Sequence, residues 1–442
     1  MQNSYKRPRA SSRGRSPDAS VWGARCANTE SIARLLRCTL LSTLVFAAIS
    51  AAHAADTPSF GALLQQAQVD APQLLEQAAN VRAAAADVRQ AQAWINPTLN
   101  ATAENIGVSQ AGVSQRENTY SVTQVFGMGG KRAARIEAGQ RRTLAANALE
   151  RQTRVGFASD LAIAYATAEA MQQRQEVSQA EFARATDDLR AAKALVKAGR
   201  EADLRLAQAR ASAAAAEAAV QSASAASTSA FERLSALVGA VEPFTRIVTP
   251  LLATTSRSFA NSWSPMDTPA LATAMAERDA LAAEVRVEEK RWLPDVGVTV
   301  GMRKYGYTDA KAPTIGVSVS IPLFDRNHGG IDAARERATS AAMRMETVRL
   351  EAIAAHRATV AQVAASERRL LAAEQGEAAA TEAYRLGRIG YDAGKTSLLE
   401  VLAIRRQLSE ATERTIEARL DRVRALATLS LAEGRTAFGE TP

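Results

Sequence analysis

Two stretches in the second half of the chain alternate between apolar residues and small or polar ones. The apolar positions are Val296, Val298, Val300 and Met302 and, after a turn, Ile315, Val317, Val319 and Ile321. A period of two is typical of β-strands with one apolar face. The pattern predicts strands at about 295–304 and about 313–322.

A weaker copy of this pattern lies in the first half. Leu99, Ala101, Tyr120 and Val122 alternate with polar residues, which predicts strands at about 97–106 and about 117–126. Each strand is about ten residues long, the length at which a tilted strand crosses a bilayer. Taken alone, the alternation would favour a pair of soluble hairpins with one face on a core, and only an export signal shifts the interpretation towards membrane strands.

Long helices are predicted after each pair of strands. The run from Lys131 to Lys197 and a second run from Asp332 to about Ile389 contain no proline. As one helix the first run would be roughly 100 Å long. The helices that return carry apolar or small residues in alternating steps of three and four, the spacing of a coiled-coil seam. These positions are Leu206, Ala209, Ala213, Ala216, Val220, Ala223, Ser227, Ala230, Leu234 and Leu237, and then Val401, Ile404, Leu408, Ala411, Thr415 and Ala418.

Landmarks of the first half recur in the second in the same order. Trp94 recurs as Trp292 and Gly199 as Gly394, with offsets of 198 and 195 residues, which indicates an internal duplication. The expected division is a leader (1–54), a first repeat (55–238), a connecting segment (239–268), a second repeat (269–434) and a C-terminal tail (435–442). Whether 239–268 is a small element or a linker stays open.

Composition and charge narrow the class of protein. Aromatic residues make up only 5% of the chain, and much of its 47% apolar content is alanine, which favours thin helices over a thick globular core. The net charge is +8. Most of it lies in residues 1–54, so the rest of the chain has no basic footprint for nucleic acid.

The first 54 residues have the features of a secretory signal peptide. A basic stretch precedes the apolar run Leu40–Ile49 and the small-residue pattern Ala52-His53-Ala54. An N-terminal membrane anchor is the alternative. Both cysteines, Cys26 and Cys38, lie in this leader, so no disulfide or thiolate metal site is expected in the mature chain. Cys38 follows Leu35-Leu36-Arg37 and lacks the small residues of a lipoprotein signal, so no lipid anchor is expected.

No later stretch offers ~18 uninterrupted apolar residues, so any membrane span is expected to be β. Lipid-exposed strands must close into a barrel, and the smallest barrels need about eight strands. Four strands per chain therefore require several chains.

Catalytic and metal-binding motifs are not found in the sequence. His328 and His356 lie at no ligand spacing, and both are expected to be solvated. The stretch from Gly127 to Lys131 lacks the spacing of a phosphate loop and is expected to form a turn that leads into a helix. We expect no enzyme, cofactor or metal site.

The leader, the duplicated unit and the paired glycine turns resemble the TolC family of outer-membrane efflux channels. The motifs Asn96-Pro97, Glu117-Asn118-Thr119, Gln124 and Gly129-Gly130-Lys131-Arg132 are similar to its CzcC-like branch, found in heavy-metal efflux systems. The resemblance implies a mainly α fold with a small β part, in which long helices form a coiled-coil barrel in the periplasm. It also implies a homotrimer with four strands per chain in one twelve-stranded outer-membrane barrel.

The expected partners are outer-membrane lipid, a periplasmic adaptor and an inner-membrane proton-driven pump, with the channel as a passive conduit for heavy-metal cations. Export of a drug or a protein by the same family is an alternative. A periplasmic coiled-coil scaffold without a barrel is another.

The resemblance also implies roles for particular residues. The turns at Ala198-Gly199 and Ala393-Gly394 match those where the adaptor docks. Glu400 matches an acid that faces the pore near the periplasmic entrance, although it could equally be a helix-end charge. Tyr391 matches a gate aromatic. Arg205 replaces the acid that usually bonds to that aromatic, so an Arg205–Glu400 contact is expected instead. The lipid-facing positions are expected to be Val296, Val298, Val300, Ile315, Val317 and Val319.

Overall fold

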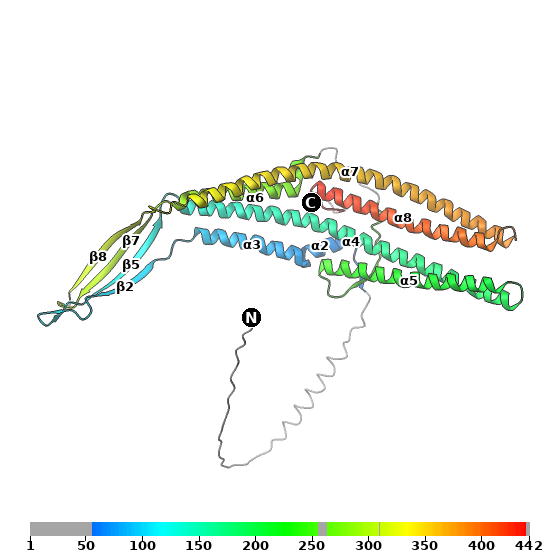
Figure 1. Cartoon of the computed structure of the whole chain (residues 1–442), viewed down its shortest axis with the longest axis horizontal. Coiled ribbons are helices and arrows are strands. Elements are labelled where there is room, and N and C mark those ends of the chain that lie inside the picture. The colour runs from blue at the N-terminus through cyan, green and yellow to red at the C-terminus, as the bar shows by residue number, and fades with distance from the viewer. Residues whose placement is uncertain (1–54, 255–262, 309, 439–442) are drawn as a thin grey trace, which may run out of the picture. The chain divides into compact units, whose positions relative to one another are not determined.

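The computed structural model describes residues 55–254, 263–308 and 310–438. The leader, with its expected signal peptide and both cysteines, lies outside the described residues. Everything described belongs to one compact unit, Ala54–Pro442. Figure 1 shows its helices and strands.

Both halves of this unit contain a helix, two long strands and a long helical hairpin in that order, and the first half begins with one additional helix. The first half contains α2 (Phe60–Asp70), α3 (Pro72–Gln92), β2 (Thr98–Glu104), β5 (Glu117–Gly127), α4 (Lys131–Lys197) and α5 (Asp203–Val238). The second half contains α6 (Pro269–Arg291), β7 (Asp295–Tyr305), β8 (Lys311–Ser320), α7 (His328–Asp392) and α8 (Leu398–Ala432). The short elements are β1 (Ala55–Thr57), β3 (Ser109–Gln110), β4 (Val113–Ser114), β6 (Phe244–Ile247) and the 3-10 helix η1 (Pro265–Asp267). The predicted fold class, mainly α with a small β part and an internal duplication, is confirmed.

The long helices α4 and α7 are continuous over 67 and 65 residues. Their returning helices α5 and α8 pack against them, and α4 also contacts α3, α6 and α8 (Figure 1). All predicted seam positions of α5 and α8 are buried or half-buried, because alanine and serine there let the helix axes approach closely. No helix in the described part of the chain is long and apolar enough to cross a membrane.

The thickest part of the core surrounds the middle of α4. Phe157, Leu161 and Tyr165 are fully buried there, among side chains from α2, α5, α8 and β6. The described part of 239–268 belongs to this core, because β6 pairs in parallel with β1, and Leu251 and Leu252 are buried. This segment is thus a packed element rather than a free linker.

The side chain of Glu169 on α4 fastens this segment. Its Oε2 accepts hydrogen bonds from the backbone N–H groups of Leu251 at 2.7 Å and Leu252 at 3.0 Å. From α8, Arg422 Nη2 donates to the carbonyl oxygen of Leu252 at 3.0 Å. Side chains from both repeats therefore hold the segment that joins them.

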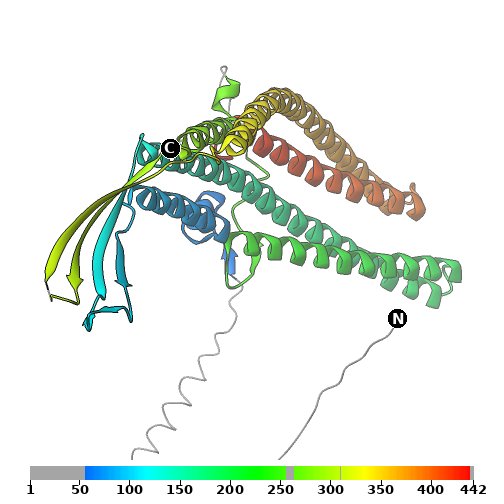
Figure 2. The ribbon, with the colours of Figure 1, turned by 60° about the vertical axis from the view of Figure 1, so that its left-hand side comes forward.

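The four long strands form one antiparallel sheet in the order β2-β5-β7-β8 (Figure 2). The pairing puts Leu99, Val122, Val300 and Ile315 in one row across the sheet. Strand β8 begins at Lys311, earlier than expected, because Lys311 and Ala312 still pair with β7. It ends at Ser320, since Pro322 has no N–H to donate to a ladder.

The expectation that both histidines are solvated is wrong for His356. Its ring stacks on Trp263 with a centroid distance of 3.8 Å, and its Nε2 lies 3.6 Å from Glu433 Oε1. Trp263 belongs to the connecting segment and His356 to α7, so no regular sequence spacing predicts that the two rings stack. His328, at the start of α7, is exposed.

Candidate functional site

The two turns that end α4 and α7 have the same backbone hydrogen bonds. Arg200 N donates to Leu195 O at 3.0 Å, and Lys395 N donates to Gly390 O at 2.7 Å. Gly199 and Gly394 have positive φ angles of 67° and 70°. This is the Schellman pattern, which needs a left-handed residue and therefore favours glycine.

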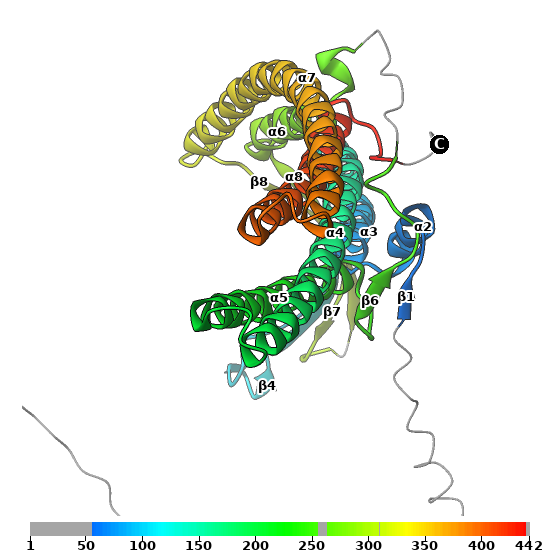
Figure 3. The same cartoon turned by 90° about the vertical axis from the view of Figure 1, so that its right-hand side faces the viewer.

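Both turns are accessible from outside the chain. Ala198, Gly199, Ala393 and Gly394 are all exposed, and a Cβ built on either glycine would meet no atom within 4 Å. In Figure 3 the ends of the hairpins α4–α5 and α7–α8 face the viewer. The predicted docking residues thus form two similar, uncovered turns.

Glu400 is the third residue of α8 and is exposed. Its backbone N–H donates to the side chain of Ser397, the N-cap, at 3.3 Å. The spacing Ser-x-x-Glu is itself a sequence signal for a capped helix start. Capping explains why an acid fits at this position, and it does not prevent the carboxylate from facing a pore.

The structure brings Arg205 and Tyr391 to one cavity of about 300 Å³ between the two hairpins. Glu400 is not among the residues that line it. Within the chain, Arg205 Nη1 lies 3.8 Å from Oε1 of Glu201, which belongs to the turn that precedes α5. The expected contact between Arg205 and Glu400 is therefore not formed within one chain.

Arg405 is a residue that sequence reasoning missed. It lies on α8 beside the same cavity and is only 6% exposed. Its Nε is 3.0 Å from Glu181 Oε1 and its Nη1 is 2.5 Å from Asp188 Oδ2, both on α4. This cluster is a charged contact that ties the second hairpin to the first.

A signal for this cluster exists in the sequence. Glu181 and Asp188 are seven residues apart, so they lie on the same face of a helix. Arg405 directly follows the seam residue Ile404, at the edge of a packing surface where charged residues set pairing. Which helix supplies the acids could not be read from spacing alone.

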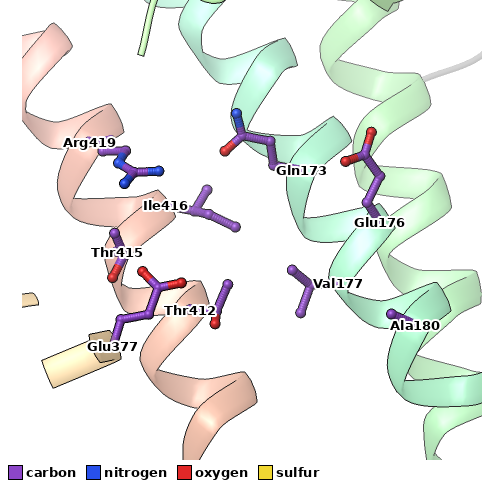
Figure 4. Close-up of a pocket in the computed structure, with 9 residues that line it drawn as sticks. All are labelled: Gln173, Glu176, Val177, Ala180, Glu377, Thr412, Thr415, Ile416 and Arg419. Carbon is purple, nitrogen blue, oxygen red and sulfur yellow. The ribbon is translucent and has the colours of Figure 1, made fainter. Parts of the chain in front are cut away.

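A second cavity, of about 340 Å³, lies further along the same hairpins (Figure 4). It opens between α4 and α8, with Glu377 contributed by α7. Its charged residues are Glu176, Glu377 and Arg419. The parts of the chain that the structure describes contain no group of three or more His, Cys, Asp or Glu arranged to hold a metal ion.

One face of the sheet is apolar and uncovered. In the row across its middle, Ile315 is 81% exposed and Val300 is 58% exposed. The expected lipid-facing residues Val296, Val298, Val300, Ile315, Val317 and Val319 all lie on this face and are exposed or half-exposed.

The opposite face is polar and internally bonded. The hydroxyl oxygens of Thr123 and Thr299 are 2.8 Å apart. Arg303 Nη1 donates to Glu117 Oε2 at 3.1 Å. The sheet thus separates apolar from polar side chains as the alternation predicts, except in β5, where Gln124 lies on the apolar face beside Val298 and Val125 lies on the polar face beside Gly297.

Comparison with protein families and known proteins agrees with this geometry. A family model described as "Outer membrane efflux protein" matches residues 63–240 and 267–435. The gap in the match falls within the connecting segment.

Three curated proteins are similar in sequence. The nickel-cobalt-cadmium resistance protein NccC of Alcaligenes xylosoxydans xylosoxydans is 53% identical over 90% of this chain and 91% of its own length. The nickel and cobalt resistance protein CnrC of Cupriavidus metallidurans is 52% identical over 89% of this chain and 94% of its own. The cobalt-zinc-cadmium resistance protein CzcC of the same organism is 28% identical over 79% and 83%.

Among solved structures, CusC superposes with a TM-score of 0.73 over 85% of this chain and 92% of its own. CusC is described as changing conformation when it folds and forms a transmembrane channel. The sequence identity is 18%, so this likeness concerns the fold.

Proposed function

The chain belongs to the outer membrane efflux protein family, and we propose that it is the outer-membrane conduit of a tripartite system that exports divalent metal cations. Membership places it in the outer membrane, with helices that extend into the periplasm. In this proposal the chain is a passive channel with no catalytic step, and a partner pump supplies the energy.

The observation that carries the proposal is the four-stranded sheet with an uncovered apolar face. Strands β2 and β8 are at its edges, so each leaves one row of backbone groups unpaired. An open strand edge is not stable in lipid, because lipid offers no hydrogen-bond partners for the unpaired backbone N–H and C=O groups. Copies of the chain joined β8 to β2 would pair both edges and turn the apolar faces outward, and three copies would give twelve strands.

The proposed cargo follows from the relatives. NccC and CnrC carry nickel and cobalt resistance in their names at 53% and 52% identity, which supports cations of this class as substrate. The exposed Glu400 suits such a cargo, since a ring of carboxylates at a pore entrance favours cations.

We assign the adaptor to the two turns at Gly199 and Gly394. Their equal backbone geometry and their exposure give a ring of copies six similar docking positions. An adaptor hairpin bound there would connect the channel to an inner-membrane pump driven by protons.

Deleting the gene in its own host tests the proposal. Growth is measured against graded Ni²⁺, Co²⁺ and Cd²⁺ and, as controls, against dyes and detergents. We expect the deletion strain to become more sensitive to at least one of the three metals but not to dyes or detergents. The wild-type gene should restore metal tolerance. Sensitivity to dyes and detergents with unchanged metal tolerance would assign the channel to drug export instead.

A further inference from the structure

All four junctions between strands and long helices lie at one end of the sheet. Helix α3 leads into β2 and α6 leads into β7, while β5 leads into α4 and β8 leads into α7. Because neighbouring strands are antiparallel, these four connections meet at the same edge. Together they form a collar between the sheet and the helices.

This collar exposes large apolar side chains. Phe324 is 101% exposed, Trp94 is 65% exposed and Trp292 is 45% exposed. Ile321 and Leu323 are exposed as well. Such side chains are costly in water, so the collar is expected to have a partner.

The collar continues the apolar face of the sheet. Trp94 packs edge-on against Phe126 at a centroid distance of 6.1 Å. Phe126 stands in one row with Val296 and Val319, on the same face as Val300. Whatever covers this face therefore reaches Trp94.

Arg326 in the collar, and Arg132 and Lys290 on the helices beside it, form no ion pair with an acid in the described part of the chain. The guanidinium of Arg132 lies 5.0 Å from the Trp94 ring centroid, and its Nε donates to Gln92 O at 2.9 Å. Lys290 Nζ donates to Gly129 O at 2.8 Å. Arg132 and Lys290 are bound to carbonyl oxygens, so each keeps its full positive charge and can attract an anion.

We propose that the collar is a phospholipid-headgroup site in the leaflet nearest the helices, in which Trp94, Trp292 and Phe324 occupy the interfacial layer while Arg132 and Lys290 bind headgroup phosphates. The indole rings of Trp94 and Trp292 suit this layer, because their apolar part lies in the acyl region while their N–H groups stay hydrated. Anionic lipid adds attraction for cations near the surface. The inference rests on the proposed outer-membrane function and specifies which residues fix the depth of the protein in the bilayer.

Lipid explains the collar better than a second copy does. A neighbour joined along the edges would approach Trp94, beside β2, and Phe324, beside β8. Trp292 precedes β7, an inner strand, which an edge contact does not reach. Arg132 and Lys290 provide the charge complementarity that phosphate groups require.

Tryptophan fluorescence tests the site in the assembled protein. Besides Trp22 in the leader, the chain has Trp94, Trp263 and Trp292, so Trp→Phe substitutions leave one emitter at a time. Each variant is reconstituted in phosphatidylcholine and phosphatidylglycerol vesicles containing lipids brominated near the headgroup or near the chain ends. We expect bromines near the headgroup to quench the emission of Trp94 and Trp292 most strongly. The emission of Trp263 should be quenched by neither of the two brominated lipids.

Two results would overturn the site. Quenching of Trp94 and Trp292 by aqueous iodide instead of lipid would place the collar in water. Protection from both quenchers would show that protein covers it. Heat-labile trimers and ion conductance, measured in the same vesicles, report on the channel itself and separate its failure from that of the collar.

A second measurement does not depend on the tryptophans. Phe324→Cys, labelled with an environment-sensitive dye, should report an apolar medium, whereas Leu399→Cys, an exposed control at the start of α8, should report water. Native mass spectrometry measures how much phosphatidylglycerol the trimers retain. The double variant Arg132→Gln with Lys290→Gln should lose the lipid, whereas Arg132→Lys should keep it. Arg151→Gln, at an exposed arginine on α4, is the control and should retain as much lipid as the wild type. Equal retention in all variants would exclude the two cations from phosphate binding.

Discussion

At the scale of single residues, Arg405 is the most tightly held charge near the turns. It is 6% exposed and is in contact with Glu181 and Asp188. Removing one partner of a buried pair leaves the other charges uncompensated, which usually costs ~3–5 kcal/mol. The acids here are partly solvated and can be rehydrated, which lowers the cost.

We therefore expect Arg405→Ala to destabilise the folded chain by about 2–3 kcal/mol in thermal unfolding in detergent. Arg414→Ala is the matched control, because Arg414 pairs with Glu410 on the surface of the same helix and should cost at most about 1 kcal/mol. Arg405→Lys should lie between the two, since an ammonium lacks the two-pronged geometry. Equal costs for Arg405→Ala and Arg414→Ala would show that the cluster contributes no more than a surface pair.

Glu169 gives the connecting segment a pH-dependent attachment. Burial raises the pKa of its carboxyl group, although the Leu251 and Leu252 N–H groups and Arg419 act in the opposite direction. The folded state then binds the proton more tightly than the unfolded state does. The contribution of Glu169 to stability is greatest below its ordinary pKa of 4.5 and falls as the pH rises through the raised value.

Glu169→Gln, which stays uncharged, should remove this dependence. We expect the unfolding midpoint of the variant to rise relative to the wild type as the pH is increased from 4.5 towards neutral. A midpoint difference that does not change with pH would mean that Glu169 has the same pKa in both states.

Glu400 should determine cation preference if it faces the pore. We expect Glu400→Gln to lower the ratio of cation to anion permeability in planar bilayers, because a ring of carboxylates loses its charge. Glu413→Gln is the control, since Glu413 points from the same helix towards Arg174 on α4, 3.7 Å away. Unchanged selectivity in Glu400→Gln would leave the carboxylate as a helix-end charge.

At the scale of elements, the long helices and strands follow from local sequence. The run from Lys131 to Lys197 has no proline and is predicted to be one helix. In the structure it is the single helix α4 over the same range. The alternation at Val296 to Met302 depends only on a period of two. Such patterns are local, so no knowledge of distant contacts is needed.

The connecting segment could not be predicted in this way. Its strand β6 is four residues long, and its partner β1 lies almost 190 positions earlier in the chain. The same holds for Trp263 on His356, and for Arg405 with Asp188, 217 residues apart. These contacts depend on how helices pack, which spacing along one element does not encode.

The two glycine turns can be tested as docking elements. Gly199→Asp and Gly394→Asp put a side chain at positive φ in open space, so strain stays local at about 1–3 kcal/mol. We expect trimers to persist while crosslinking to the adaptor and metal efflux are lost. Gly376→Asp, a helical glycine of α7 with free space around it, should leave crosslinking intact. Loss of the trimer in Gly199→Asp would make the turn structural.

At the scale of the whole molecule, the sheet cannot be stable alone. It has an uncovered apolar face and two open edges, while its polar face is bonded internally. In the proposed assembly, copies that join edge to edge pair the open edges, and the bilayer covers the apolar face. The sequence predicted which side chains share a face, but not the order β2-β5-β7-β8, because pairing β5 with β7 joins the two repeats.

The central claim, that the apolar face meets lipid in an assembled barrel, is tested most directly by one pair of lysine substitutions. Val298 lies on the apolar face, and Ser318 lies on the polar face opposite Gly297, at nearly the same depth. We expect Val298→Lys to lose ~2–4 kcal/mol of stability in the membrane, and Ser318→Lys far less. The measurement is the yield of heat-labile trimers in outer membranes. Reduced yield for Val298→Lys with near wild-type yield for Ser318→Lys is the predicted result, and equal yields would contradict the account.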